Sequence, residues 1–245
     1  MPITATAALR DRAAAAGEQL PESNSESVSI IIPVYNEASQ LDGNLKKLFI
    51  DLKNSEIEVI LSDGGSTDNT LTIAKQYPCK ILSSEIGRAR QMNTACDHAN
   101  GEFLLFLHAD SNLPDGWLKQ VQASQNWGFF PVRLSGRHWL LRIIESAINL
   151  RSRASKVATG DQGLYFRKSF FDDLKGFPDI PIMEDVAISK RARELSKPCI
   201  GRNPVVTSSR RWEQNGIVKT VVLMWGLRFA YWLGISPHRL HRIYQ

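Results

Sequence analysis

Hydrophobic residues in the first half of the chain form short unbroken runs, separated by segments with helical spacing. The runs at 28–34 (VSIIIPV) and 103–107 (FLLFL) are typical of strands covered on both faces of a sheet. Shorter runs at 58–61 and 80–83 predict two further strands. Helices are expected between the strands, at 41–52, 68–77 and 87–100. This alternation predicts an α/β fold with right-handed crossovers and a doubly wound, mostly parallel sheet.

The second half of the chain has a less regular pattern. We expect a helix at 114–125, a strand at 129–134 and a basic amphipathic helix at 138–153. A strand at 160–166 and a helix at 185–195 follow. We divide the chain into an arm (1–27), one α/β domain (28–215) with a first half (28–125) and a second half (126–215), and a tail (216–245). The arm is rich in Ala, Ser and Glu and lacks the apolar core of a secretory leader, so we expect it to be disordered or loosely helical.

The tail combines a strongly apolar segment with a basic end. Lys219 and Arg228 interrupt residues 217–235, which leaves spans too short to cross a bilayer. At about 100° per residue, the apolar side chains form one stripe between these two charges and a second apolar surface on the far side. Residues 238–242 (HRLHR) supply cations suited to anionic headgroups. We expect an amphipathic helix that packs on the domain with one face and meets lipid with the other, although burial in a larger fold or a homodimer explains the pattern equally well.

The net charge of +5 is concentrated at the C-terminal end. Residues 202–245 hold seven Lys/Arg and one Glu, so they carry +6 and the rest of the chain carries −1. A basic tail beside a nearly neutral domain favours phosphate or anionic lipid as a partner, and no nucleic-acid-binding motif is visible. The three cysteines, Cys79, Cys96 and Cys199, lack the spacing of metal ligands, which indicates reduced thiols in a cytoplasmic protein.

Polar side chains follow four of the predicted strands. They are Asn36 and Glu37, Asp63, Glu85, and the triplet His108-Ala109-Asp110. The carboxyl ends of parallel strands share one edge of the sheet, where ligands bind in a crevice. We therefore expect these groups to converge, with Arg88 and Arg90 nearby, on a metal ion and a phosphorylated ligand.

Two common nucleotide sites are absent from this sequence. A dinucleotide site of the Rossmann type needs Gly-x-Gly-x-x-Gly directly after the first strand, and residues 33–37 (PVYNE) contain no glycine. The chain also lacks the Gly-x-x-x-x-Gly-Lys-Ser/Thr phosphate loop. The sequence therefore argues against NAD-dependent dehydrogenases and P-loop NTPases.

Six short motifs, taken together and in order, resemble those of family 2 glycosyltransferases. They are IIPVYNE (31–37), SDGGSTDNT (62–70), GRARQMN (87–93), FLHAD (106–110), GDQG (160–163) and MEDVAISKRA (183–192). The third, fifth and sixth motifs are similar to the small bacterial branch known as radical-SAM/selenodomain-associated transferases. The resemblance covers roughly residues 28–215 and implies the GT-A fold, a nucleotide-sugar donor with UDP favoured over GDP, Mn²⁺ or Mg²⁺, and inversion at the anomeric carbon.

By this resemblance the first half of the domain would bind the donor. Tyr35 would lie against the nucleotide base, and the Asp63 carboxylate would accept a hydrogen bond from an N–H on the edge of that base. Glu37 would hold the ribose hydroxyls. Arg88 and Arg90 would neutralise the diphosphate, because guanidinium groups match phosphate oxygens in a bidentate way. Tyr35 also suits a cover for the sheet edge, and Arg90 also suits a surface ion pair. The full set of donor-binding candidates is Pro33, Tyr35, Asn36, Glu37, Asp63, Arg88, Arg90, Asn93, Ala109, Asp110, Asp161, Gln162 and Arg211.

Metal binding is where this sequence departs from the family pattern. The family usually carries Asp-x-Asp after the fourth strand, and residues 108–110 are His-Ala-Asp. Asp110 would hold Mn²⁺ or Mg²⁺ against the leaving diphosphate. A coordinating His108 would favour manganese, since imidazole suits Mn²⁺ better than Mg²⁺, but a hydrogen bond to the diphosphate suits His108 equally well.

The resemblance places the catalytic base in the second half, which would face the acceptor. Asp185 would take the proton of the acceptor hydroxyl, and Glu184 would orient the site or serve in its place. Asp161 and Gln162 would reach hydroxyls of the donor sugar or the acceptor, although a strained turn before a strand explains them as well. Arg211 would clamp the diphosphate.

The function expected from the sequence is transfer of a sugar to the hydroxyl of an acceptor that is lipid-like or a small polar molecule. Trp212 would flank this acceptor. The enzyme is expected in the cytoplasm, with a peripheral contact to the inner membrane face through its tail. Two alternatives stay open. One is a sugar-phosphate nucleotidyltransferase, although the Gly-rich basic loop of that class is missing after the first strand. The other is a non-catalytic nucleotide-sugar-binding module of a membrane complex, for which His108 leaves room.

Overall fold

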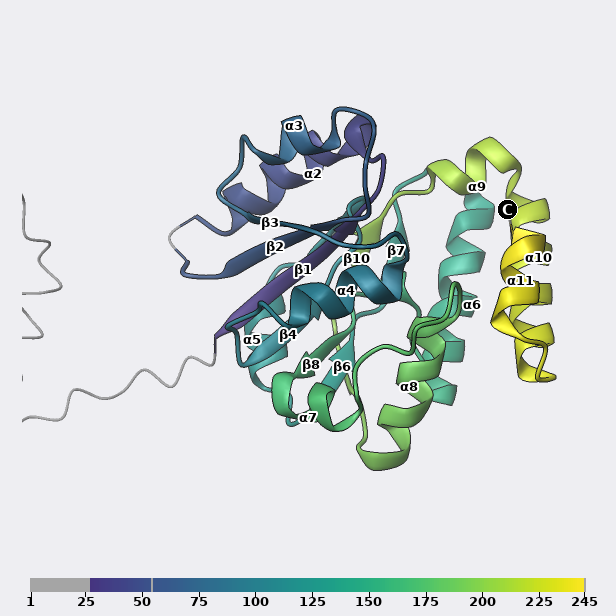
Figure 1. Cartoon of the computed structure of the whole chain (residues 1–245). Coiled ribbons are helices and arrows are strands. Elements are labelled where there is room, and N and C mark those ends of the chain that lie inside the picture. Colours follow the sequence, from purple (N-terminus) through teal and green to yellow (C-terminus); the bar gives the residue numbers. More distant parts are fainter. Residues whose placement is uncertain (1–26, 54, 245) are drawn as a thin grey trace, which may run out of the picture.

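The computed structural model describes residues 27–53 and 55–244 (Figure 1). Within them, the larger of two sheets has seven strands. They are β1 (Val28–Val34), β2 (Glu58–Asp63), β3 (Lys80–Ser83), β4 (Phe103–Phe106), β6 (Trp127–Phe129), β8 (Tyr165–Arg167) and β9 (Cys199–Ile200). In the spatial order β3-β2-β1-β4-β8-β6-β9, the first four strands are parallel, and β8 runs antiparallel to β4 and β6. The prediction of an α/β fold with a mostly parallel sheet is confirmed.

Helices cover both faces of this sheet (Figure 1). They are α2 (Ala38–Asp51), α3 (Thr70–Ala74), α4 (Arg88–Cys96), α5 (Trp117–Gln122), α6 (Trp139–Ser155), α7 (Lys168–Asp173), α8 (Glu184–Leu195), α9 (Arg210–Asn215), α10 (Ile217–Trp232) and α11 (Pro237–Tyr244). Ile30 and Ile32 of β1 pack with α2, α3 and α5, whereas Ile31 packs with α4, α7 and α8 on the other face. Since successive side chains of a strand point to opposite faces, the unbroken apolar run of β1 supplies both hydrophobic layers.

The predicted helices differ from the observed ones mainly in length. α2, α4, α6 and α8 overlap the ranges that the sequence predicts. α3 occupies only part of the predicted range 68–77. The Asp68 carboxylate accepts the Thr70 N–H at 2.9 Å at its start, and Pro78 follows shortly after its end. Both features stop a helix from extending further.

The second sheet has three short strands, β5 (Ser111–Asn112), β7 (Val132–Leu134) and β10 (Val205–Thr207), with β10 in the centre. The prediction of one strand at 129–134 is therefore wrong. Pro131 has no N–H to donate to a sheet, and the chain passes there from β6 in the larger sheet to β7 in the smaller one.

The strand predicted at 160–166 is also shorter than expected. A 3₁₀ turn at Gly160–Gln162 comes first, closed by reciprocal hydrogen bonds between Thr159 and Gln162. Gly163 follows with a φ of +56°, a left-handed conformation that glycine adopts without strain. Only Tyr165–Arg167 then joins the sheet as β8. The turn keeps residues 160–161 out of the sheet, beside the site described below.

α10 and α11 form the tail and pack on the rest of the domain through a few apolar side chains. Leu227 and Leu240 are buried against Met183 and Val186 at the start of α8. One face of the tail thus packs on the domain, as the sequence predicts. Within the described residues, no helix is both long and apolar enough to span a bilayer. The arm predicted at 1–27 lies outside the described residues, apart from Ser27.

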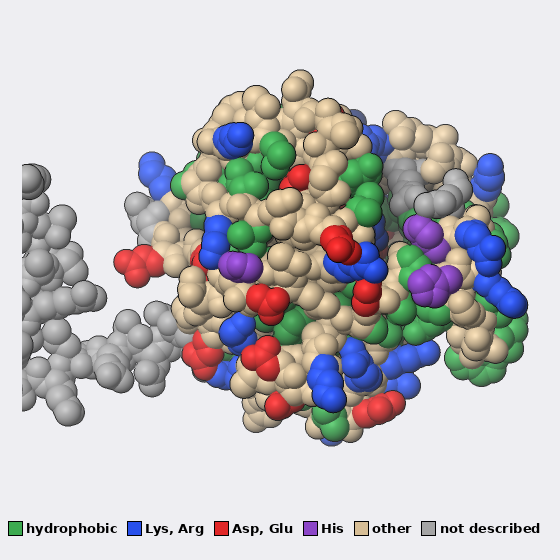
Figure 2. All heavy atoms as spheres, in the orientation of Figure 1, with side chains coloured by type: hydrophobic (Ala, Val, Ile, Leu, Met, Phe, Trp, Pro, Cys, Tyr) green, Lys and Arg blue, Asp and Glu red, His purple; other side chains and the backbone are tan. Residues whose placement is uncertain are grey.

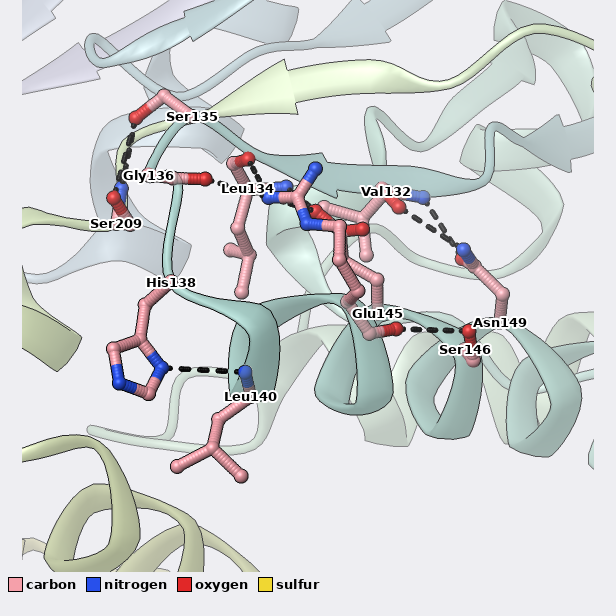
Figure 3. Close-up of polar contacts among 11 residues, drawn as sticks. Val132, Leu134, Ser135, Gly136, His138, Leu140, Glu145, Ser146, Asn149 and Ser209 are labelled. Carbon is pink, nitrogen blue, oxygen red and sulfur yellow. Dashed lines mark hydrogen bonds and ion pairs between the residues drawn. The ribbon is translucent and has the colours of Figure 1, made fainter.

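Side chains of α6 hold this helix against the free edge of β7 (Figure 3). Asn149 accepts the Val132 N–H at 2.8 Å and donates to the Val132 carbonyl at 3.0 Å. Glu145 accepts the Leu134 N–H, and Arg142 donates to the Leu134 carbonyl at 2.6 Å. These groups satisfy backbone atoms that have no neighbouring strand, so they fix α6 relative to the small sheet.

Asn149→Ala is expected to lower the free energy of unfolding by about 1–3 kcal/mol, because both backbone groups of Val132 lose a partner in a half-buried position. Urea denaturation followed by circular dichroism measures the change. Ser146→Ala, on the exposed side of the same helix, is the matched control and should change stability by less than about 0.5 kcal/mol. An Asn149→Ala protein as stable as this control would show that these bonds do not hold α6.

Candidate active site

The loops after β1 and β2 hold each other in place at the carboxyl edge of the sheet. Asn36 has a φ of +54° and donates its backbone N–H to the Ser66 hydroxyl at 2.9 Å. The Asn36 side chain accepts the Thr67 N–H at 2.9 Å, and the Glu37 N–H donates to the Thr70 hydroxyl at 2.8 Å. Asn36 therefore bridges the two loops, whereas Glu37 lines a cavity described below.

Asp63 shapes the second of these loops. It is 4% exposed, and its carboxylate accepts the N–H groups of Gly65 at 3.0 Å and Ser66 at 3.1 Å. It is not among the residues that line the two cavities described next. The structure thus leaves Asp63 outside the convergence that the sequence predicts, and its contact with a base stays a prediction.

Two adjoining cavities open at this edge of the sheet. The strand-edge cavity, of about 340 Å³, lies between the end of β1, the starts of α4 and α8, and the tail. The helix-side cavity, of about 210 Å³, extends from the end of β4 towards α6 and α10. Pro33, Tyr35, Glu37 and Glu184 line the first, and His108, Asp110, Asp161 and Trp212 line the second. The residues common to both are Arg88, Thr159, Asp185, Met224, Arg228 and Tyr244.

Three chain segments meet at Gly160. Asp185, in the first turn of α8, accepts the Gly160 N–H at 2.7 Å. A Cβ added at Gly160 would lie 2.6 Å from Nε2 of His108 and 3.6 Å from Oδ2 of Asp185. Only glycine therefore lets the imidazole and the carboxylate lie this close to the turn. The structure brings His108 and Asp185 together from opposite halves of the domain.

Arg88 is the cation at the centre of the site. Burial would lower its pKa, but the negative charges of Glu184, Asp185 and Asp110 nearby raise the pKa overall. The acids come from the end of β4 and the start of α8, and Arg88 begins α4. Of the groups predicted to converge, Glu37, Arg88, His108 and Asp110 thus line the two cavities, whereas Asp63, Glu85 and Arg90 do not. Asp185 joins them from the second half of the domain. A guanidinium in this position suits a phosphorylated ligand.

Burial raises the pKa of three carboxyl groups of the site, those of Glu37, Asp161 and Glu184. It raises the pKa of Glu184 to about 7, helped by the charge of Asp185 and opposed by Arg88. It also raises the pKa of Glu37, with Asp110 adding to the effect. Perturbed carboxyl groups that share a cavity are common at sites of proton transfer.

A divalent metal fits this site only with help from its ligand. Burial and the nearby Arg88 lower the pKa of His108 to about 3, so the imidazole is neutral at pH 7 and has a lone pair available for a metal. Asp110 lines the same cavity and accepts the Thr207 hydroxyl at 3.4 Å. Among the residues described, no group of three or more His, Cys, Asp or Glu is arranged to hold a metal ion. The protein thus offers one carboxylate and one imidazole, which fits an ion coordinated largely by diphosphate oxygens and water.

Two predicted phosphate-binding side chains have other partners. Arg90 donates to Glu85 at 2.6 Å and to Asp179 at 2.9 Å on the surface, and it lines neither cavity. Asn93 donates to the Phe177 carbonyl at 2.8 Å and accepts the Phe177 N–H at 3.0 Å. We therefore correct both assignments. Arg90 matches the surface ion pair that the sequence also allows, and Asn93 anchors the loop before α8.

Two further candidates contribute to the structure of the site rather than to its lining. Gln162 is fully buried, and its side-chain carbonyl accepts the Ser152 hydroxyl at 2.8 Å and the Thr159 N–H at 3.1 Å. Ala109 is buried, and its carbonyl accepts the side chain of Asn44 at 2.9 Å. We therefore correct the prediction that Gln162 contacts sugar hydroxyls, because its side chain stabilises the turn instead. The side chain of Arg211 lies outside what the structure describes.

Sequence reasoning missed two arginines of the site. Arg151 of α6 and Arg228 of α10 line the helix-side cavity, near enough to Asp161 and Asp185 for these carboxylates to act on the pKa values of both arginines. In the sequence, Arg151 is one of several basic residues in an amphipathic helix, and Arg228 only interrupts an apolar segment. For Arg228, a cation in the middle of an apolar helix was the available signal, since such a charge needs a partner when it is buried.

The pKa of Glu184 predicts how stability changes with pH. The folded protein keeps this proton up to a pH of about 7, whereas the unfolded chain releases it near its ordinary pKa of 4.5. Stability from this group is therefore lost as the pH rises between these values. Glu184→Gln should be more stable than the wild type at pH 8 and lose that advantage at pH 5, as measured by urea unfolding. Glu194→Gln, at the exposed end of the same helix, is the control; an equal effect of Glu184→Gln at both pH values would contradict the assignment.

Comparison with known proteins identifies relatives of part of the chain. Residues 29–129 match the family described as Glycosyl transferase family 2. Glycosyltransferase AglE of Haloferax volcanii is 34% identical over 101 residues, which cover 38% of this chain and 33% of that protein. An undecaprenyl-phosphate 4-deoxy-4-formamido-L-arabinose transferase of Shewanella sediminis is 28% identical over 159 residues, which cover 59% of this chain and 48% of that protein. The chain thus spans half or less of the length of these curated relatives.

Solved structures share the fold over most of the chain. The crystal structure of S. aureus TarS 1-349 matches with a TM-score of 0.62 at 22% identity. The match covers 75% of this chain and 60% of the TarS chain. Mannosyltransferase PcManGT from Pyrobaculum calidifontis, in complex with GDP-Man and Mn²⁺, matches with a TM-score of 0.58 at 23% identity. The match covers 82% of this chain and 63% of the PcManGT chain. Residues 29–129 therefore match a glycosyl transferase family 2 domain, and the chain has the α/β fold of GT-A glycosyltransferase structures.

Proposed function

We propose that this protein is an inverting glycosyltransferase that moves a sugar from a nucleotide-sugar donor, with UDP favoured, to an acceptor hydroxyl. The observation that carries the proposal is the meeting of Arg88, Asp110 and Asp185, from three separate elements, around two adjoining cavities. This arrangement provides a cation for a diphosphate and a carboxylate for a hydroxyl proton. TarS has been solved with UDP-GlcNAc, and residues 29–129 match glycosyl transferase family 2, which supports this class of donor. The motif resemblance favours the radical-SAM/selenodomain-associated branch.

The donor would occupy the strand-edge cavity. Tyr35 is 45% exposed at its rim and offers a ring for the base, and Glu37 offers a carboxyl group for the ribose hydroxyls. Arg88 would hold the diphosphate between the two cavities. Asp63 orders the neighbouring loop, and its carboxylate keeps acceptor capacity beyond the two backbone N–H groups that it binds, so it would accept an N–H of the base as well.

The metal would be held by Asp110 and His108 in the helix-side cavity. Mn²⁺ suits this pair better than Mg²⁺, because one of the two ligands is an imidazole. When bound, the ion would offset the negative charge that develops on the departing diphosphate. PcManGT was solved with Mn²⁺ and GDP-Man, which supports a metal at this type of site.

Asp185 would be the general base. It accepts the Gly160 N–H at 2.7 Å, which fixes its carboxylate at the junction of the two cavities. The acceptor hydroxyl would give its proton to Asp185 while its oxygen attacks the anomeric carbon from the side opposite the nucleotide, which inverts that centre. Glu184, with a pKa raised to about 7 by burial, would hold Arg88 rather than act as a permanent anion. Trp212 and Asp161 line the cavity on the acceptor side.

Purified protein with Mn²⁺ should bind a nucleotide sugar from a panel of UDP and GDP donors and hydrolyse or transfer it, and chelation of the metal should reduce this activity. Asp185→Asn should lower transfer by about 100- to 10,000-fold, because no carboxylate then takes the proton of the attacking hydroxyl. Nucleotide binding should stay as in the wild type. Calorimetric titration with UDP and release of the nucleotide product measure the two effects.

Asp173→Asn, on the surface of α7, is the matched control and should behave as the wild type. Comparable turnover by Asp185→Asn would remove this residue from the base role. Release of pyrophosphate from a nucleoside triphosphate would instead support a nucleotidyltransferase. Tight nucleotide binding with no turnover on any acceptor would favour a non-catalytic module.

We also propose that the tail contacts the cytoplasmic face of a membrane. On the outer face of α10, beyond the side chains that line a cavity, Val218, Val222 and Trp232 are between 65% and 70% exposed. Figure 2 shows histidine and Lys/Arg side chains beside hydrophobic atoms on the side of the molecule that holds α11. An apolar face next to cations suits an interface with anionic lipid.

Trp232→Glu should reduce co-sedimentation with phosphatidylglycerol vesicles by about fivefold or more, because it places a negative charge in the apolar face. Ile50→Glu, an equally exposed position on α2, is the control and should bind vesicles as the wild type does. A wild-type dimer that becomes monomeric with Trp232→Glu, and binds no vesicles, would establish the homodimer alternative.

A further inference from the structure

An apolar groove runs between α6 and α10, which lie side by side at the end of the molecule that carries the tail (Figure 1). This α6–α10 groove has a volume of about 730 Å³. Its apolar walls are formed by Ala147, Ile148, Leu150, Ala154, Trp225, Gly226 and Phe229. Arg151 and Arg228 are the charged residues among those that line it. A groove of this size and composition suits a hydrocarbon chain.

The groove adjoins the helix-side cavity. Ile148, Arg151, Trp225 and Arg228 line both spaces, so they form the junction between them. On the far side of this junction lies Asp185, the proposed base. A ligand that enters from the groove therefore meets apolar surface first, then two guanidinium groups, and then a carboxylate.

The two arginines at the junction have guanidinium N–H groups that are available to a ligand. Arg151 donates to neutral hydroxyls, at 3.0 Å to Ser152 and 3.4 Å to Thr159, and its buried Nε has no hydrogen-bond partner. Within the part of the chain that the structure describes, no hydrogen bond or ion pair fixes the guanidinium of Arg228. Burial and the charge of Arg228 lower the pKa of Arg151 to about 10, which still leaves it protonated at neutral pH. Two neighbouring cations with open N–H groups match the oxygens of a phosphate.

We infer that the acceptor is an amphiphile in which an apolar chain, a phosphodiester and a hydroxylated head follow one another in that order. The inference rests on the proposed function, because the head hydroxyl must meet Asp185. The chain lies in the α6–α10 groove, and Arg151 and Arg228 hold the phosphate at the junction. The phosphate charge distinguishes this ligand from a neutral glycolipid.

The order of these groups also fixes which oxygen reacts. Transfer forms a bond between the head hydroxyl oxygen and the anomeric carbon, and it breaks the bond between that carbon and the diphosphate. The electron pair leaves with the nucleotide, and the hydroxyl proton passes to Asp185. The phosphodiester stays intact. A lipid phosphate monoester that reacted through its own oxygen would need its phosphate at Asp185, beyond the arginines, and would not need a base.

Binding to the full-length protein without nucleotide tests the inference independently of donor chemistry. Calorimetric titration compares myristoyl-lysophosphatidylglycerol, below its critical micelle concentration, with glycerophosphoglycerol, which lacks the chain, and with monomyristoylglycerol, which lacks the phosphate. The first should bind at least about tenfold more tightly than either of the others, since it alone fills both groove and junction. UDP binding is measured separately, so a protein that binds UDP but not the amphiphile contradicts only the acceptor inference.

Gly226→Trp should remove the advantage of the chain, so that lysophosphatidylglycerol and glycerophosphoglycerol bind alike. A Cβ at Gly226 meets no atom within 4 Å, and Gly226 lines the groove, so this position accepts a side chain and is suited to filling the groove. Gly43→Trp, in α2 and equally unobstructed, is the matched control and should bind as the wild type does. Ala154→Phe fills the groove from α6 and provides a second variant. Arg228→Gln should remove the advantage of the phosphate.

Three results would overturn the inference. Equal binding of the probes with and without a chain would show that the groove holds no hydrocarbon. Binding only above the critical micelle concentration would show that this face adsorbs to lipid surfaces instead of holding one molecule. Glycosylation of dodecyl phosphate that persists in Asp185→Asn would show that a phosphate oxygen is the acceptor.

Discussion

The meeting of three chain segments at Gly160 is the contact on which the site depends. The Asp185 carboxylate accepts the Gly160 N–H at 2.7 Å, and the His108 imidazole occupies the space into which a side chain at position 160 would project. His108 follows β4 in the first half of the domain, and Asp185 lies in the first turn of α8 in the second. The absence of a Cβ therefore allows the proposed metal-binding residues and the proposed base to share one cavity.

The same closeness determines the charges of the site. Arg88 lies among acids from two other elements, and burial raises the pKa of Glu184 to about 7. Each charge is tolerated because an opposite charge or a hydrogen-bond donor is near, since an unpaired charge in a partly buried cavity is costly. A diphosphate and a cation would enter as a nearly balanced pair, which such a site accepts more readily than either charge alone.

The sequence predicts the first half of the fold well, because its strands are unbroken apolar runs whose polar ends must share one edge. The strand-end pattern therefore places Asp110, with Arg88 nearby, at this edge, whereas only the motif resemblance points to Glu184 and Asp185. The prediction fails where tertiary contacts determine the structure. The apolar run at 129–134 divides at Pro131 between two sheets, and the Asp63 carboxylate binds backbone N–H groups of its own loop. Local patterns cannot reveal such choices, since they depend on which distant partner is available.

The tail shows why charge along a sequence is an incomplete guide to charge in space. Of the cations in the basic segment 202–245, Arg228 is half-buried between the cavities and the groove, and Arg210, just before the tail, donates to the Ser39 hydroxyl at 2.9 Å. Leu227 and Leu240 pack against the start of α8, so the helix that carries Arg228 also supports the segment that carries Asp185. The surface available to anionic lipid is thus less basic than the sequence suggests, because part of the tail's charge belongs to the wall of the site. Removing the tail would therefore disturb the chemistry as well as any contact with a membrane.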